Sequence, residues 1–279
     1  MFFLKLIRLL VYSNVFIAIC AVGLQWFCWP STSVEASAFI FFTVLSIYST
    51  LKLIGLKNHS QQHEHTAIGW LQHNTVLQYG ITLGALIGSF LCWILLEFLI
   101  YSSWWIALVL LLIYVFFRKV HVFSSLPQLF QASMKIGVVA AVWTIVIVPI
   151  HLKEVPFFLL LYIFIFVLAL MIPFEIRDMQ YDLPFRVPTL PLLLGVQKAK
   201  QISYVLLVFS FLLYLSAGSG TEQKCAVGLT TIAGLAMVRI SSTSSSDFFF
   251  LIGVDGLLLL PLVVTLFLND LILFYHTIL

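Results

Sequence analysis

The chain has 279 residues, of which 62% are hydrophobic and only 9% are charged. A soluble domain is about 45–50% apolar and about 25% charged, so this composition excludes a soluble enzyme and a disordered chain. The net charge of +3 comes from 14 basic and 11 acidic residues spread along the sequence, which excludes a nucleic-acid-binding surface. We therefore expect an integral membrane protein with a single transmembrane domain over residues 1–279.

Apolar stretches follow one another along the whole sequence, and a bilayer span requires about 20 such residues. They predict an all-α fold, a polytopic bundle of nine transmembrane helices. The fourth and fifth stretches are short, and the third and fourth nearly meet. The nine stretches cover residues 9–29, 36–56, 78–100, 102–117, 136–150, 156–174, 202–218, 225–240 and 248–269.

The first stretch has some features of a signal peptide. Lys5 and Arg8 precede it, and the residues Ala36, Ser37 and Ala38 resemble a cleavage site. The apolar run is longer than the hydrophobic region of a signal peptide, so we expect a first helix that is retained.

Basic residues indicate the orientation, because Lys and Arg gather in cytoplasmic loops. With the N-terminus inside and nine spans, 12 of the 14 basic residues lie inside, and only Lys153 and Lys224 lie outside. We expect the bacterial inner (plasma) membrane, a cytoplasmic N-terminus and a C-terminus outside. The inner residues are Lys5, Arg8, Lys52, Lys57, Arg118, Lys119, Lys135, Arg177, Arg186, Lys198, Lys200 and Arg239.

One long cytoplasmic loop is rich in histidine: it holds His59, His63, His65 and His73. The first two have the i, i+4 spacing that can ligate Zn²⁺ on a helix. Solvated histidines in a polar loop are the more common explanation, so the role of residues 59–73 stays open.

Two features lie within the spans. Gly80, Gly84 and Gly88 repeat every four residues and predict a close helix contact. Asp255 lies about 12 Å beyond the membrane boundary, so it is either a functional acid or a hydrogen-bonded structural one. Because it is the only deep acid and no inverted repeat is evident, a transporter is less well supported.

The acidic residues Glu175, Asp178 and Asp182 follow the sixth stretch. On a helix they lie at about 0°, 300° and 340°, on one face, whereas Arg177 at about 200° points elsewhere. Three neighbouring carboxylates need a cation, and Mg²⁺ typically bridges such acids to phosphates. A solvated loop that only orients the protein is the alternative.

At these residues the chain resembles the UbiA superfamily of intramembrane prenyltransferases. The family's second Asp-rich motif, D-x-x-x-D, corresponds to Asp178 and Asp182, followed here by Thr189, Leu190, Pro191 and Gly195. A second patch of similarity comprises Tyr114, the basic pair Arg118 and Lys119, and Pro127-Gln128.

The resemblance implies nine helices and a polyprenyl diphosphate that binds through Mg²⁺ and passes its prenyl group to an aromatic or lipid acceptor. Asp178 and Asp182 are the expected catalytic residues, and together with Glu175 the expected metal ligands. Residues expected to bind the substrate are Arg118, Lys119, Arg186 and Lys52. Expected partners are membrane lipid, an isoprenoid diphosphate or quinone-like molecule, and a further membrane protein.

The family's first motif, N-x-x-x-D-x-x-x-D, is absent, because residues 46–58 contain no acid and carry Lys52 and Lys57 instead. A catalytically inactive protein of this fold is therefore the second hypothesis. It would bind a quinone, isoprenoid or lipid, or serve as a subunit of a membrane complex. We further expect Lys52, or failing it Lys57, to pair with Asp178 or Asp182; the alternative is that Lys52 extends to the lipid headgroups.

Overall fold

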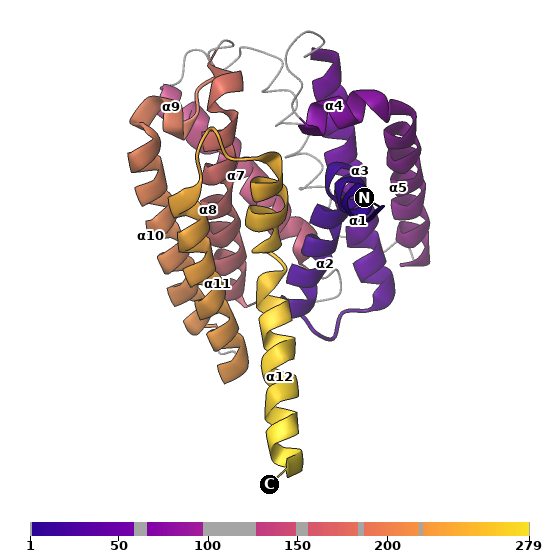
Figure 1. The fold of residues 1–279 in the computed structure, drawn as a ribbon. Helices are drawn as coiled ribbons and strands as arrows, with labels where there is room; N and C mark the ends of the chain where they lie inside the picture. The colour runs from indigo at the N-terminus through magenta and orange to yellow at the C-terminus, as the bar shows by residue number, and fades with distance from the viewer. Residues whose placement is uncertain are drawn as a thin grey trace. The chain divides into compact units, whose positions relative to one another are not determined.

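The structure is a computed structural model that describes residues 2–58, 66–96, 127–148, 156–183, 187–217 and 220–278. Every regular element among these residues is a helix (Figure 1). The all-α fold of a membrane protein is thereby confirmed. The expected fourth span, residues 102–117, lies outside the described residues.

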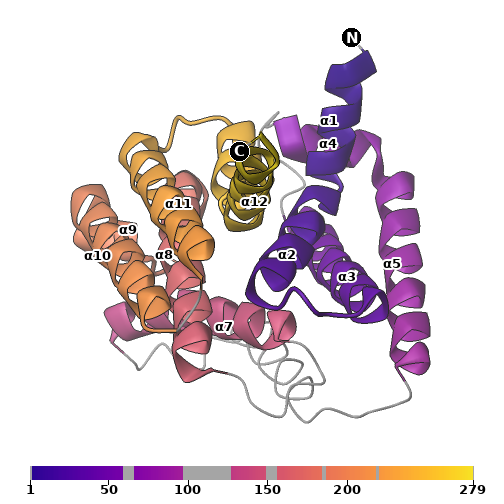
Figure 2. The ribbon, with the colours of Figure 1, turned by 90° about the horizontal axis from the view of Figure 1, so that it is seen from below.

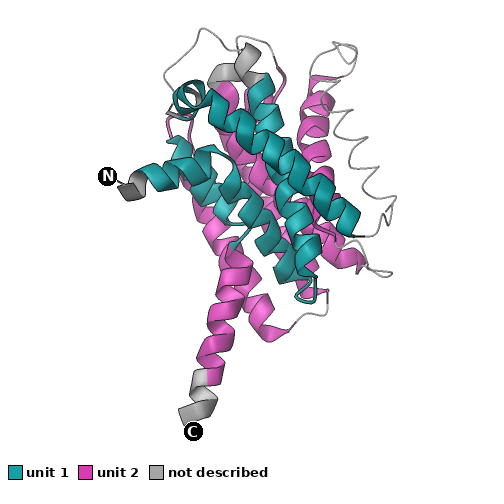
Figure 3. Ribbon diagram, turned by 90° about the vertical axis from the view of Figure 1, so that its right-hand side faces the viewer, with its two compact units in different colours: residues 1–99, 246–259 teal, residues 100–245, 260–279 magenta. Residues whose placement is uncertain are grey.

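The chain divides into two compact units (Figure 3). Unit 1 comprises residues 1–99 and 246–259, and unit 2 comprises residues 100–245 and 260–279. The single transmembrane domain expected over 1–279 stays a prediction.

In unit 1 the helix α3 packs against both α2 and α5 (Figure 2). The short helix α4 lies next to α1 and α5, and a π-helical segment, η2, lies against α2. The bounds are Phe2–Tyr12 for α1, Val15–Cys28 for α2, Val34–Asn58 for α3, Thr66–His73 for α4, Thr75–Leu95 for α5 and Phe249–Val254 for η2.

The first expected span is a bent pair of helices rather than one straight helix. Its two parts, Lys5–Tyr12 and Val15–Cys28, meet at 67°. The break occurs at Asn14, whose φ of 68° and ψ of 10° lie in the left-handed region. Asparagine tolerates this conformation better than most residues, because its short polar side chain can bond locally.

The predicted contact of the three glycines on α5 is correct for one of them. A Cβ on Gly88 would lie 2.8 Å from the Phe42 ring of α3, whereas Gly80 and Gly84 have nothing within 4 Å of that position. A step of four residues exceeds one helical turn by about 40°, so the row of glycines winds around α5, and of the three only Gly88 comes close to Phe42 of α3.

In unit 2 the helix α8 packs against α7, α9 and α10, and α11 packs against α10 and α12. The bounds are Gln128–Ile147 for α7, Phe157–Asp182 for α8, Leu190–Leu194 for α9, Val196–Leu215 for α10, Thr221–Ile240 for α11 and Leu260–Ile278 for α12. Side chains of four helices form its buried core around the end of α8: Ala132, Ile136, Ile172, Ile176, Leu190 and Ala199.

Five described helices are long and apolar enough to cross a membrane, and the bent pair makes up to six. The count of nine spans is thus not confirmed. Helix α11 carries Glu222, Lys224 and Arg239, which lower its apolar character. The ninth expected span begins with the π-helical turns of η2, and its α-helix starts only at Leu260.

Candidate functional site

Helix α8 carries all three predicted acids, because it runs without a break from Phe157 to Asp182 through Pro173. Proline has no N–H, so the helix loses the bond that residue 173 would donate to the carbonyl of Ala169. The hydroxyl of Ser203 on α10 donates to that carbonyl at 2.8 Å instead. The helix therefore continues past the proline to the acids.

Glu175 lies inside unit 2, where its side chain is only 4% exposed. Its Oε1 is 3.5 Å from the Lys135 Nζ of α7, and its Oε2 accepts the main-chain N–H of Leu190 at 3.1 Å. A buried carboxylate is tolerated when it is paired and hydrogen-bonded in this way. Glu175 thus connects α7, α8 and the start of α9.

This environment does not fit Glu175 as a metal ligand, because the ammonium of Lys135 beside it would repel a dication. Within the described ranges, no group of three or more His, Cys, Asp and Glu side chains gathers as a metal site would. The side chain of Asp182 lies outside the described residues.

Asp178 makes its ion pair with the residue next to it. Arg177 Nε donates to Oδ1 at 2.7 Å, and Nη2 donates to Oδ2 at 3.3 Å. The expectation that Arg177 points elsewhere is therefore wrong: its long side chain folds back along the helix surface. The guanidinium also lies 5.2 Å from the centre of the Phe174 ring. The Asp178 side chain is 38% exposed, which leaves it accessible.

Thr189, in the segment that resembles the family's second motif, is fully buried. Its hydroxyl has no hydrogen-bond partner among the described residues, although it directly precedes Leu190, whose N–H reaches Glu175. Such an unsatisfied buried hydroxyl is uncommon and marks this turn as a place where a ligand or water could bond.

Lys52 lies in unit 1, where its ammonium donates a hydrogen bond to the main-chain carbonyl of Tyr12. It also lies 6.0 Å from the centre of the Tyr12 ring. The predicted partners Asp178 and Asp182 belong to unit 2, so that pairing stays a prediction, as does the role of Lys57. The expected substrate-binding residues Arg118, Lys119 and Arg186 lie outside the described residues.

An aromatic cluster around Tyr12, the residue that Lys52 contacts, was not anticipated from the sequence. The Tyr12 ring lies 6.0 Å from the ring of Trp70 and 5.2 Å from that of Phe248. Nearby in the chain, Asp247 accepts the N–H of Ala67 at 3.3 Å in the first turn of α4. These contacts join α1, α4 and the segment before η2.

Two further features that the sequence singled out are Asp255 and the histidine-rich loop. Asp255 is buried, as expected for an acid at membrane depth. The ring Nδ1 of His73 lies 2.9 Å from the Gly69 carbonyl of its own helix, which satisfies it locally. The remaining histidines of the loop lie outside the described residues.

The fold is that of solved UbiA homologues. A UbiA homologue from Archaeoglobus fulgidus bound to GPP and Mg²⁺ matches with a TM-score of 0.56 and 16% identity, over 93% of this chain and 97% of that chain. The same homologue bound to DMAPP and Mg²⁺ matches with a TM-score of 0.55 and 15% identity, over 93% of this chain and 96% of that chain. A structure of digeranylgeranylglyceryl phosphate synthase matches with a TM-score of 0.50 and 13% identity, over 94% of this chain and 98% of that chain.

No family model and no curated protein matches the sequence. The resemblance to the UbiA superfamily that the α8 motif indicated is thus confirmed at the level of the fold, along nearly the whole chain. The protein is a helical membrane protein with the UbiA architecture.

Proposed function

We propose that this protein belongs to the UbiA superfamily, binds a polyprenyl diphosphate and transfers the prenyl group to an aromatic or lipid acceptor. The observation that carries the proposal is the fold, which follows a homologue bound to GPP over 93% of the chain. The motif residues on and after α8 support it, because Asp178 is accessible at the end of that helix.

In this reaction the allylic C–O bond of the donor breaks, and its electron pair leaves with the diphosphate. The allylic carbon then bonds to the acceptor, which loses a proton. Arg118, Lys119 and Arg186 would neutralise the departing diphosphate. Asp178 and Asp182 are the acids that would hold Mg²⁺, which supplies charge neutralisation in related sites. Glu175 has a positioning role instead, because Lys135 and the Leu190 N–H engage it.

A specific observation favours the second candidate, an inactive protein that binds an isoprenoid, quinone or lipid. Each acid on α8 whose side chain is described, Glu175 and Asp178, contacts a basic side chain of the protein itself. Where the family's first motif would add further acids, the chain places Lys52. A site balanced by its own cations has less need of a metal.

Prenyl transfer separates the two candidates. The full chain in lipid nanodiscs is incubated with Mg²⁺ and with DMAPP, geranyl diphosphate or longer donors, in the presence of aromatic and lipid acceptors. Transfer that Asp182→Asn abolishes, while helical content and monodispersity persist, supports the enzyme. Asp270→Asn, an exposed acid near the C-terminal end, is the control and should retain activity.

Saturable binding of geranyl diphosphate without turnover would support the inactive binding protein. The absence of both binding and turnover would contradict the transferase and an inactive protein that binds a prenyl diphosphate. A Mg²⁺ titration tests the role of Lys52: weak binding that Lys52→Ala strengthens agrees with an internal cation in the site. Tight binding that Lys52→Ala leaves unchanged would refute that role.

A further inference from the structure

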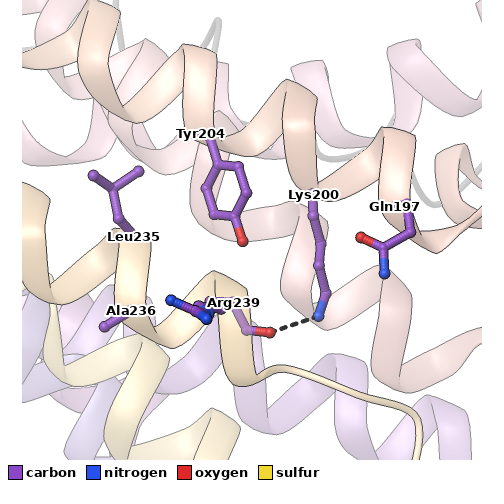
Figure 4. A pocket seen from close by; sticks show the side chains of 6 residues that line it. All are labelled: Gln197, Lys200, Tyr204, Leu235, Ala236 and Arg239. Atoms are coloured by element: carbon purple, nitrogen blue, oxygen red, sulfur yellow. Dashed lines mark hydrogen bonds between the residues drawn. The ribbon is translucent and has the colours of Figure 1, made fainter.

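Helices α10 and α11 are neighbours in unit 2 with a groove between them where α10 begins and α11 ends (Figure 4). Farther along, Phe211 packs over Gly228, where a Cβ would lie 3.5 Å from the ring, and the helices close on each other. The groove has a volume of about 770 Å³ and is lined by Gln197, Lys200, Tyr204, Leu235, Ala236 and Arg239.

Two cations, Lys200 and Arg239, line the groove, and its lining residues include no carboxylate. The Lys200 ammonium donates to the Arg239 carbonyl at 2.8 Å, in the last turn of α11, where carbonyls lack partners within the helix. An ammonium has three donors, so this bond fixes Lys200 and leaves two donors for a ligand. None of the carboxylates in the described part of the chain pairs with Lys200 or Arg239.

Neutral groups complete the polar end of the groove. Tyr204 contributes a phenol and Gln197 an amide, both from the helix face that carries Lys200 (Figure 4). Two positive charges with neutral donors beside them favour a phosphate-type anion, because hydrogen bonds to ionised oxygens are the stronger ones. Leu235 and Ala236 give the same groove an apolar wall.

The surface beyond the groove is apolar and exposed. Val208 and Leu212 of α10 and Leu229 and Ile232 of α11 are all exposed large hydrophobic side chains. In a membrane protein such a surface is typical of contact with acyl chains. A ligand that fits both parts has an anionic head and an apolar tail.

We propose that this groove binds an anionic phospholipid, with the headgroup phosphate at Lys200 and Arg239 and an acyl chain along the exposed residues of α10 and α11. The expected orientation places the basic end at the cytoplasmic leaflet, whose anionic lipids attract basic side chains. Its lining residues all belong to α10 and α11, and the proposal does not depend on the proposed transferase activity.

Native mass spectrometry of the full chain, released from mixed vesicles of dioleoylphosphatidylglycerol and dioleoylphosphatidylcholine, tests the site. The unmutated protein should retain one phosphatidylglycerol in preference to phosphatidylcholine. Removal of one cation, in Arg239→Gln or Lys200→Ala, should weaken this binding about fivefold, and removal of both about thirtyfold. Lys198→Ala is the matched control, because Lys198 is an exposed lysine of the same helix that does not line the groove.

Arg239→Gln keeps the test valid if Lys200→Ala perturbs folding, because it removes an exposed charge and leaves the main-chain acceptor of Lys200 in place. Equal retention of the two lipids, or equal losses in Lys198→Ala and Arg239→Gln, would overturn the proposal. Displacement of the lipid by inorganic phosphate or by geranyl diphosphate at equal concentration would also overturn the proposal. The groove would then be a site for free phosphate or for the prenyl donor.

Discussion

The Ser203 hydroxyl and the Ala169 carbonyl form a buried hydrogen bond of 2.8 Å between α10 and α8. Ala169 is four residues before Pro173, so its carbonyl is the one that the missing proline N–H leaves without a donor. The neighbouring helix supplies that donor. The path of α8 beyond the proline, and thus the placement of its acids, depends on a residue thirty positions later in the chain.

Ser203→Ala should lower the free energy of unfolding by about 1–2 kcal/mol, because it leaves a buried carbonyl unsatisfied. Ser210→Ala is the control, since Ser210 is equally buried on α10 but bonds its own helix, at the Leu207 carbonyl. SDS titration of the protein in mixed micelles measures both. In a Pro173→Ala background the penalty at Ser203 should shrink, because α8 then provides its own donor. A penalty unchanged in that background would refute this account.

The pair Lys135–Glu175 predicts an asymmetry. Lys135→Met should destabilise the protein by about 3 kcal/mol, because it removes the cation beside the buried carboxylate of Glu175. The double substitution Lys135→Met with Glu175→Leu should recover most of this loss, since no buried charge remains. The same unfolding titration is applied to Lys135→Met, to Glu175→Leu and to the double variant. A double variant that loses the sum of the two single losses in free energy of unfolding would contradict this prediction. Lys198→Met, an exposed site, should have little effect.

The two glycines Gly84 and Gly88 should respond in opposite ways to alanine. Gly88→Ala places a Cβ within 2.8 Å of Phe42 and should destabilise by about 1–3 kcal/mol through overpacking. Gly84→Ala meets open space and should be neutral or stabilising by up to about 1 kcal/mol. Thermal unfolding in detergent compares the two, and an equal loss would mean that Gly84 also lies in a helix contact.

Asp247 caps a helix that is 180 residues away in sequence, by accepting the N–H of Ala67. Asp247→Ala should weaken α4 by about 0.5–2 kcal/mol, as the loss of a cap typically does. Hydrogen exchange should show faster exchange across Thr66–His73, while Asp247→Asn, which keeps an acceptor oxygen, should change it less. Unaltered exchange in Asp247→Ala would exclude the capping role.

The sequence predicted the class of fold because hydropathy and charge asymmetry are properties of the local sequence. It missed the starts of two helices whose N-terminal halves carry a lysine, α7 and α10. Helix α7 begins at Gln128, eight residues before the expected 136, because Lys135 is paired with Glu175 and the helix can include it. Helix α10 begins at Val196, not 202, and its Lys200 bonds to the Arg239 carbonyl.

The candidate site was predicted only in part, since helical geometry places Cβ atoms but not long side chains. Glu175, Asp178 and Asp182 lie on one helix as expected. The folding back of Arg177 onto Asp178, and the partner that Lys135 provides to Glu175 from another helix, depend on side-chain reach and tertiary packing. No periodicity in the sequence reports either contact.

The left-handed conformation at Asn14 limits which sequences can share this fold. A residue with φ of 68° joins α1 to α2, so natural variants at this position should be confined to Gly, Asn and Asp, the residues that adopt it at low cost. Loss of one residue here would rotate α2 by about 100° about its axis and move its buried side chains toward lipid. Position 14 should therefore tolerate neither deletions nor β-branched residues, even though it lies in a turn.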